Sequence, residues 1–297
     1  ALLCTYRYYH NRNLVLIQSN TMYGVKTIVP TSGCSLAGFI DCQLKTLMPS
    51  LQVLKVAIAD LDKKDKYQLI ILLSHIGGII NPDIESIAAL CEDENIILLE
   101  DCAHSFGATL NDNHSGLFGD AGVYSFYATK AIPAGEGGVV ITNNLELGNM
   151  IKKFSIYDRF DQKLQIGNNI RISEIQALFS FSVVKELKNI INNKKSIANQ
   201  FITACEELNI SYIHQNKNGQ KGNYYKFVVY NKDKSISELL PNLKTKTSAV
   251  YDYYLGDCDN LILHHACLPI WYGQEQSVTD KVINELSNDC LNMKKES

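Results

Sequence analysis

Short, wholly apolar runs that alternate with a helix-like segment constrain the fold of this chain most strongly. Residues 68–73 and 96–99 are predicted strands, and Pro82 predicts the first turn of a helix that continues to about residue 93. Strands that are apolar on both faces and are separated by a helix are typical of a parallel sheet covered on both sides. We therefore predict an α/β fold with a mostly parallel sheet covered by helices.

The same alternation extends over the first half of the chain. Ser50 is predicted to cap a further helix, and a Gly-rich turn at 135–138 separates the last two strands of this region. The additional predicted strands are residues 15–18, 38–40, 123–126 and 139–142. Because the strands continue past residue 120, one large α/β domain is expected to occupy residues 1–180.

A second, smaller unit is expected after this domain. Ser173 is a predicted helix N-cap with Gln176 at the capping-box position, and one long helix or a broken pair should follow it to about residue 208. The polar segment 189–195 is predicted to be a solvated part of that helix. Beyond it, the chain is expected to form a strand at 224–230 and a capped helix at 277–286. We therefore predict a small C-terminal α+β domain over residues 181–297.

The charge balance and the cysteines restrict partners and location. With Lys+Arg 28 against Asp+Glu 31, the net charge of −3 lacks the basic excess of nucleic-acid or anionic-membrane binders. The longest apolar runs are too short to span a bilayer, and no leader opens the sequence. The nine cysteines are scattered without a C-x-x-C pair, which favours reduced thiols over disulfides or zinc. We predict a cytoplasmic protein with no nucleic-acid or membrane partner.

Neighbouring histidines give no reason to expect a metal ion. His264 and His265 are adjacent on a predicted strand, where successive side chains point to opposite faces. They therefore cannot form one ligand set, and no metal site is predicted.

Chemically active side chains follow two of the predicted strands. Glu100 and Asp101 come directly after the strand 96–99; Ser125 lies near the end of the strand 123–126, and Lys130 follows that strand. Ligands in open α/β sheets bind outside the carboxyl ends of the strands. A carboxylate for a pyridinium nitrogen, a hydroxyl for a phosphate and a lysine amine for an imine are the groups that hold pyridoxal phosphate.

Five blocks of sequence, in this order, resemble the DegT/StrS family of nucleotide-sugar aminotransferases. They are EDCAHSFGA at 100–108, GD at 119–120, YSFYATK at 124–130, GEGG at 135–138 and GNNIRISEIQA at 167–177. The resemblance covers residues 1–180 clearly and the C-terminal part weakly. It implies the pyridoxal-phosphate-dependent transferase fold of type I, with pyridoxal 5'-phosphate as cofactor.

Carried over position by position, the resemblance implies a set of cofactor-binding residues. Lys130 would bind the cofactor covalently and move the proton, and Asp101 would pair with the pyridine nitrogen. His104 would lie beside the cofactor ring and Ser125 would bind its phosphate. Asn169 would reach the phosphate bound in a neighbouring subunit, which implies a homodimer with shared active sites.

The N-terminal region departs from the family pattern. Ala1 and Leu2 resemble an Ala-Leu pair that follows a phosphate-binding Ser-Gly-Thr turn, so this turn is expected to be either absent or upstream of Ala1, and the large domain is expected to be incomplete at its N-terminus. Gln18 stands where the family has proline. Met22 stands where an aromatic side chain stacks on the cofactor ring, so either Met22 or the neighbouring Tyr23 is expected to cover that face.

The resemblance implies an aminotransferase that moves an amino group, from glutamate, to a keto group of a nucleotide-linked deoxysugar. Lys130 argues for transamination, because a sugar dehydratase of the family has histidine at that position. One alternative is a catalytically degenerate member that acts as a binding or regulatory subunit. A Rossmann-type nucleotide-binding enzyme is disfavoured, because no Gly-rich fingerprint follows an early strand.

Overall fold

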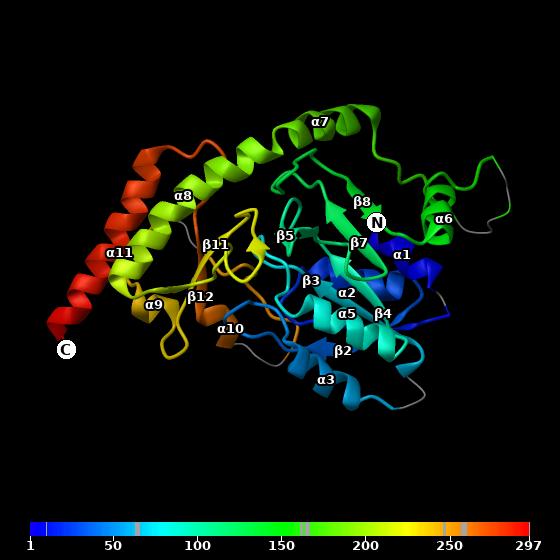
Figure 1. The fold of residues 1–297 in the computed structure, drawn as a ribbon, viewed down its shortest axis with the longest axis horizontal. Coiled ribbons are helices and arrows are strands. Elements are labelled where there is room, and N and C mark those ends of the chain that lie inside the picture. Colours follow the sequence, from blue (N-terminus) through cyan, green and yellow to red (C-terminus); the bar gives the residue numbers. More distant parts are fainter. Residues whose placement is uncertain are drawn as a thin grey trace.

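Figure 1 shows the computed structural model, which describes residues 1–9, 11–62, 66–160, 163, 167–245, 248–256 and 260–296. A six-stranded sheet forms the centre of the larger part of the molecule. Across the sheet, the strands are β2 (Ser35–Ile40), β1 (Leu14–Gln18), β3 (Leu69–Ser74), β4 (Ile97–Asp101), β7 (Ala121–Ser125) and β8 (Gly138–Ile141). Neighbouring strands pair in parallel except β7 and β8, which are antiparallel. The predicted mostly parallel α/β sheet is thus confirmed.

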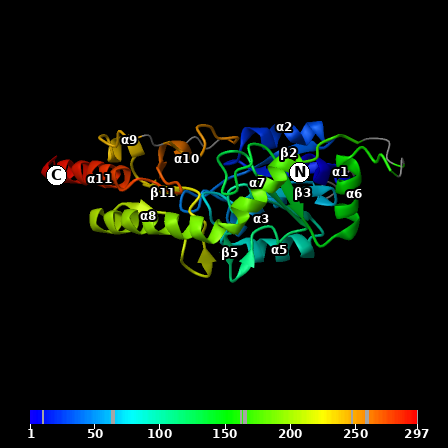
Figure 2. The ribbon, with the colours of Figure 1, turned by 90° about the horizontal axis from the view of Figure 1, so that it is seen from above.

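Helices cover both faces of this sheet, as its apolar strands require. In β3, Leu69 and Ile71 pack on one face with α3 and α5, whereas Ile70 and Leu72 pack on the other with α1, α2 and α6. Figure 2 shows α2 and α5 on opposite sides of the strands. The bounds are α1 (Leu2–Tyr8), α2 (Tyr23–Thr31), α3 (Leu51–Ala59), α5 (Ile84–Asp93) and α6 (Leu145–Ser155). Because successive side chains of β3 point to opposite faces of the sheet, they contribute to two apolar layers, one on each face. Burial of these layers stabilises the large domain.

Two helix boundaries show how side chains decide local structure. Ser50 accepts a hydrogen bond from Val53 N and caps α3, as predicted. Helix α5 begins at Ile84 rather than at Pro82. Asn81 explains why the helix starts later. Its side-chain amide oxygen accepts from Asp83 N (2.9 Å), and its side-chain amide nitrogen donates to Pro49 O (2.8 Å). These bonds hold residues 81–83 in a turn that competes with the helix.

The second half of the chain packs around its own apolar cluster. The capping box predicted at Ser173 and Gln176 is present at the start of α7 (Glu174–Lys185), and Glu186 separates α7 from α8 (Leu187–Leu208). The broken pair, one of the two predicted forms, is therefore correct. In Figures 1 and 2, α8 lies beside α11 (Gln276–Glu296). The remaining elements are β9 (Ser211–Tyr212), β11 (Phe227–Tyr230), β12 (His265–Leu268), α9 (Ile236–Leu239) and α10 (Asn260–Leu263).

Phe201, Phe227, Val282 and Leu286 are fully buried members of this second cluster, which joins α8 and α11 to the sheet β12–β11–β9. A further small sheet contains β10 (Gln220–Lys221), β5 (Thr109–Leu110) and β6 (Asn113–His114). It links the two parts of the molecule, because β10 belongs to the second half of the chain. We propose that the boundary between the two domains lies in α7, near residue 180.

The strand predicted at 224–230 begins only at Phe227. The preceding residues pair with a turn of the large domain instead, since Asn223 N donates to Gly78 O (3.0 Å) and Lys226 N donates to Gly77 O (2.9 Å). Gly78 permits this approach, because it has a φ of +109° and a Cβ atom there would lie 2.3 Å from the Asn223 side chain. The close contact places Tyr225 and Lys226 beside the carboxyl ends of the central strands.

Within the described part of the chain, no helix is long and apolar enough to cross a membrane. The described cysteines are free thiols: Cys4, Cys34, Cys42, Cys91, Cys102, Cys205 and Cys267.

Candidate active site

The carboxyl ends of β3, β4 and β7 bring several polar side chains together. Ser74 ends β3, Asp101 ends β4 and Ser125 ends β7. Lys130 lies in the loop that joins β7 to β8, where Ala128 N donates to Gly135 O and Ala134 N donates to Phe126 O. Parallel pairing thus gathers residues that are far apart in the sequence at one edge of the sheet, which is where open α/β sheets bind ligands.

Asp101 is a buried carboxylate held by a short chain of hydroxyl groups. Its Oδ1 accepts from Ala103 N (3.0 Å) and its Oδ2 accepts from Ser74 Oγ (3.1 Å). The Thr21 hydroxyl lies 2.7 Å from Ser74 Oγ. Burial raises the pKa of Asp101, although the Ala103 hydrogen bond and the charge of Lys130 oppose the rise. Ser74 was not identified from the sequence, because an isolated hydroxyl residue at a strand end carries no pattern, and Thr21 was given no role.

The departure at Gln18 has a structural reason. Its side chain is buried, its Oε1 accepts from Ser74 N (3.0 Å) and its Nε2 donates to Asn20 O (2.9 Å). Gln18 therefore holds in place the strand end that supports Asp101. A proline at this position could form neither bond.

Glu100, the residue before Asp101, anchors the loop after β6. Its carboxylate accepts from the backbone N–H groups of Gly116, Phe118 and Gly119 (2.7–2.8 Å) and lies 2.8 Å from His75 Nε2. His75 Nδ1 in turn accepts from Asn81 N (3.1 Å). Cys102 lies close to this pair, but the Glu100 and His75 atoms that would bind a metal already have hydrogen-bond partners. Glu100 and His75 thus form a structural pair.

We expect Glu100→Gln to destabilise the fold by about 3–5 kcal/mol, because it breaks a buried, hydrogen-bonded pair. Burial would raise the pKa of Glu100, but the hydrogen bond and charge of His75 and the backbone N–H groups lower it overall. The stabilisation by Glu100 is therefore present above the ordinary glutamate pKa and is lost as the pH falls through the lower value in the folded state. Thermal unfolding at pH 7 and in acid should show this, with the exposed Glu92→Gln as control. An unchanged melting temperature at pH 7 would contradict the structural role.

His104 stands in an aromatic stack beside Asp101. Its ring centroid lies 4.4 Å from that of Tyr225 and 5.8 Å from that of Tyr251, and its Nε2 lies 3.4 Å from the Tyr251 hydroxyl. Burial, together with the charges of Lys130 and Lys226, lowers the pKa of His104 well below its usual value, so the ring is neutral. Its Nδ1 is buried and has no hydrogen-bond partner among the described residues. His104 is therefore a buried, uncharged ring in contact with two tyrosine rings, with one polar atom that no described residue uses.

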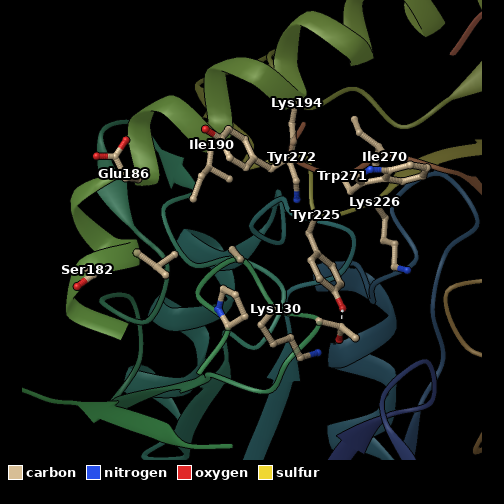
Figure 3. Close-up of a pocket in the computed structure, with 14 residues that line it drawn as sticks. Lys130, Ser182, Glu186, Ile190, Lys194, Tyr225, Lys226, Ile270, Trp271 and Tyr272 are labelled. Atoms are coloured by element: carbon tan, nitrogen blue, oxygen red, sulfur yellow. Dashed lines mark hydrogen bonds between the residues drawn. The ribbon is translucent and has the colours of Figure 1, made fainter. Parts of the chain in front are cut away.

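Lys130 is half-buried, and its ammonium nitrogen lies 5.2 Å from the centre of the Tyr225 ring. Within the described ranges, this ammonium makes no hydrogen bond or ion pair. Its charge acts on both Asp101 and His104, so the three side chains share one electrostatic environment. In Figure 3, Lys130 lies below Tyr225, whose hydroxyl is linked to Thr129.

The other residues predicted for the site lie at varying distances from this cluster. Met22 and Tyr23 are exposed at the start of α2, directly after Thr21, and Tyr23 N donates to the Tyr253 hydroxyl (2.5 Å). Ser125 Oγ accepts from Tyr127 N (3.3 Å). Asn169 is exposed between α6 and α7, where its side chain accepts from Arg171 Nε (3.2 Å). Among the described contacts, none joins Asn169 to Lys130 or Asp101 of the same chain.

The cluster fits the ring of pyridoxal phosphate. Asp101 is a buried carboxylate with a raised pKa, which a protonated ring nitrogen would stabilise in its charged form. His104 provides an uncharged aromatic ring, and Lys130 provides an amine that pairs with no described residue. For the phosphate, this chain offers the Ser125 hydroxyl at the end of β7. These groups form a site for pyridoxal phosphate in a chain with the type I fold of pyridoxal-phosphate-dependent transferases.

Residues 5–283 match the model of the DegT/DnrJ/EryC1/StrS aminotransferase family, and the chain belongs to this family. The crystal structure of a family aminotransferase from Brucella abortus superimposes with a TM-score of 0.85 at 19% identity, covering 96% of this chain and 82% of that one. The PLP-form of Spr1654 from Streptococcus pneumoniae gives a TM-score of 0.83 at 13% identity, covering 98% and 85%. The predicted family, fold class and cofactor are confirmed.

Relatives with curated functions are similar over shorter stretches. GDP-perosamine synthase from Vibrio cholerae is 27% identical over 212 residues, which are 68% of this chain and 57% of that protein. UDP-4-amino-4,6-dideoxy-N-acetyl-beta-L-altrosamine transaminase from Helicobacter pylori is 32% identical over 122 residues, which are 39% and 32%. The chain thus spans about half or less of these relatives.

Proposed function

We propose that the chain is a pyridoxal-phosphate-dependent aminotransferase that transfers an amino group, from glutamate, to a keto group of a nucleotide-linked deoxysugar. The observation that carries this proposal is the unpaired amine of Lys130, placed beside the buried Asp101 and the neutral His104. The curated relatives, a perosamine synthase and an altrosamine transaminase, support the sugar class of substrate. The free cysteines support a cytoplasmic location.

When bound, pyridoxal phosphate supplies a carbonyl carbon that accepts the amino group and a ring that withdraws electrons. Lys130 would be the amine that holds that carbon until the amino donor displaces it, and would then remove and return the substrate proton. Asp101 keeps a proton on the ring nitrogen, and Ser74 and Thr21 hold Asp101 in position. His104 would lie beside the ring. Met22 or Tyr23 would cover the ring from the start of α2, and Ser125 would donate to the phosphate.

A half-reaction tests this function against the alternative of a degenerate binding or regulatory subunit. Protein with added pyridoxal phosphate should absorb in the near-visible range, and glutamate should change this spectrum and release one 2-oxoglutarate per site. The second half-reaction should then aminate a nucleotide-linked keto sugar. Cofactor binding without any exchange with amino donors would favour the degenerate alternative.

We propose that the enzyme is a homodimer that buries the exposed face of α7. Ile175, Leu178, Phe179 and Phe181 are 53–82% exposed, although they are large and apolar. A contiguous apolar face of this kind on a well-capped helix marks an interaction site. Asn169 lies a few residues before α7, so a partner bound here would be close to Asn169. This arrangement supports a shared active site in which Asn169 donates to the partner's cofactor phosphate.

The expected result for Leu178→Glu is a shift from dimer to monomer in light scattering, because a charge on the buried face would be desolvated without a partner. Lys188→Glu changes charge on the exposed side of the next helix and should leave the dimer intact. A monomeric wild-type protein, or a dimeric Leu178→Glu variant, would contradict this interface.

Mixing inactive Lys130→Ala chains with Asn169→Ala chains tests whether the sites are shared. Asn169→Ala alone should weaken cofactor binding about ten- to a hundredfold, since one charge-assisted hydrogen bond contributes roughly 1.5–3 kcal/mol. In a mixed dimer, one site carries both changes and the other carries neither. Equal mixing makes about half of the dimers mixed, so about a quarter of the sites should recover activity at low cofactor concentration. Proven subunit exchange without recovery would refute sharing.

A further inference from the structure

Asn223 is a buried amide that joins the second half of the chain to the loop after β4. Only 1% of the residue is exposed. Its Nδ2 donates to His104 O and to Phe106 O, both at 2.9 Å. Its Oδ1 accepts from Tyr225 N (2.8 Å). Both hydrogens of the amide nitrogen and the amide oxygen are therefore used, and each bond leads to a different part of the proposed active site.

The first bond fixes the turn that carries His104. This turn follows Asp101 directly, and Asp101 Oδ1 accepts from Ala103 N (3.0 Å) at its start. The turn is thus held from two sides, by Asp101 within the large domain and by Asn223 from the second half of the chain. Because the backbone position determines where the side chain lies, Asn223 helps to set the place of the His104 ring relative to Asp101.

The second bond reaches the Lys130 loop through packing. The ring centroid of Phe106 lies 6.2 Å from that of Phe126, and Phe106 packs against the buried cluster of Phe126, Ile132 and Ala134. In the sequence, Phe126 precedes Lys130 and the other two residues follow it, so the cluster supports the loop on both sides of Lys130. A displacement of Phe106 would therefore be transmitted to this loop.

The third bond holds the Tyr225 ring. This ring lies 4.4 Å from the His104 ring and 5.2 Å from the Lys130 ammonium. Tyr225 and Lys130 line the same cavity of about 610 Å³ (Figure 3). The backbone of Asn223 is itself fixed, because Asn223 N donates to Gly78 O (3.0 Å). A shift of Tyr225 would therefore change the surroundings of His104 and Lys130 together.

We propose that Asn223 is a positioning residue of the active site, whose side-chain amide holds the His104 turn, the Lys130 loop and the Tyr225 ring in fixed positions relative to one another. The amide is buried and already hydrogen-bonded, so it acts through these residues rather than on a ligand. The expected effect on turnover rests on the proposed function, whereas the effect on His104 requires neither cofactor nor substrate.

The His104 ring reports on this role in the cofactor-free protein. Burial, with the charges of Lys130 and Lys226, lowers its pKa well below the usual value, so its NMR signal should not titrate near neutral pH in the wild type. Asn223→Ala leaves two buried carbonyl oxygens without their donor, so the turn should loosen and admit water. The pKa of His104 should then rise toward the ordinary histidine value of about 6.5. The His104→Gln variant assigns the signal among the seven histidines.

In the cofactor-loaded enzyme, Asn223→Ala should lower kcat by about 10- to 100-fold with little change in the KM of the amino donor. Small displacements of catalytic groups have effects of this size, even when the change lies outside the reacting atoms. If Asn223→Ala does not fold, Asn223→Ser keeps a small polar group in the same space and can donate to only one of the two carbonyl groups.

Gln220→Ala is the matched control. Gln220 is a buried amide of the same segment and also joins the two halves of the chain, because its Oε1 accepts from Ile80 N (3.2 Å) and its Nε2 donates to Ile80 O (2.5 Å). Ile80 has no role in the proposed site. Gln220→Ala should therefore lower the melting temperature but leave the His104 titration and kcat as in the wild type.

A folded Asn223 variant with the wild-type His104 titration, or with the wild-type kcat, would overturn the inference. An equal change of His104 in Gln220→Ala would also overturn it, because Asn223 would then be one of several structural contacts between the two halves. Failure of the proposed function gives a different pattern. A wild-type protein that exchanges no amino group loses the function, and the His104 titration of the cofactor-free variants still decides the role of Asn223.

Discussion

Lys130→Ala should show no near-visible absorbance with added pyridoxal phosphate and no detectable transamination. The variant lacks the amine that binds the cofactor carbon and the base that moves the substrate proton, so the rate should fall by more than about 10⁴-fold. The fold should be intact, because the Lys130 ammonium makes no ion pair with described residues and contributes little packing. Its melting temperature should therefore stay near that of the wild type.

Lys226→Gln is the matched control for Lys130→Ala. Both remove a lysine whose ammonium lies about the same distance from Tyr225, 5.2 Å for Lys130 and 5.3 Å for Lys226. Only the loss of Lys130 should abolish the cofactor absorbance. If the Lys130→Ala protein keeps that absorbance, or if the Lys226→Gln protein loses it, the assignment of Lys130 is wrong.

Asp101→Asn should keep the cofactor absorbance but lower the turnover number by roughly 10²–10⁴-fold. A neutral amide cannot stabilise a proton on the ring nitrogen, so proton removal from the substrate becomes slow. The side chain keeps its shape, and its oxygen can still accept from Ala103 N or from Ser74, so the protein should fold.

Ser74→Ala tests how much the turnover number depends on the hydrogen bond that positions Asp101, rather than on the charge of Asp101. It leaves the Asp101 carboxylate in place but removes the hydroxyl that donates to it, so its effect on turnover should be smaller than that of Asp101→Asn. Asp93→Asn, an exposed change on α5, controls for surface charge. Wild-type turnover in Asp101→Asn would remove Asp101 from the proposed mechanism.

Local pattern was sufficient to predict the central sheet. The strand at 68–73 and the capping box at Ser173 depend on residues close together in the sequence, and the structure reproduces both within a residue or two. Asp101 and Lys130 were predicted at strand ends, and the parallel topology brings strand ends to one edge. The predicted roles of these residues, and of His104, Ser125 and Asn169, remain proposals.

The burial of Lys194 and the position of Tyr225 were not predicted, because both depend on contacts between the two halves of the chain. The polar helix segment around Lys194 looks solvated in sequence, yet Tyr225 and the segment 270–272 cover it in the folded protein. Tyr225 itself was assigned to a strand, but the turn at Gly78 holds it beside His104 instead. In both cases, tertiary packing overrides the local pattern, which has no information about distant partners.

The most direct test of the account is to locate the covalent attachment of the cofactor. Protein incubated with pyridoxal phosphate is reduced with borohydride, digested and analysed by mass spectrometry. We expect one phosphopyridoxyl group per chain, on the peptide that contains Lys130. A label found on Lys194 or Lys226 instead, or no label at saturating cofactor, would contradict it.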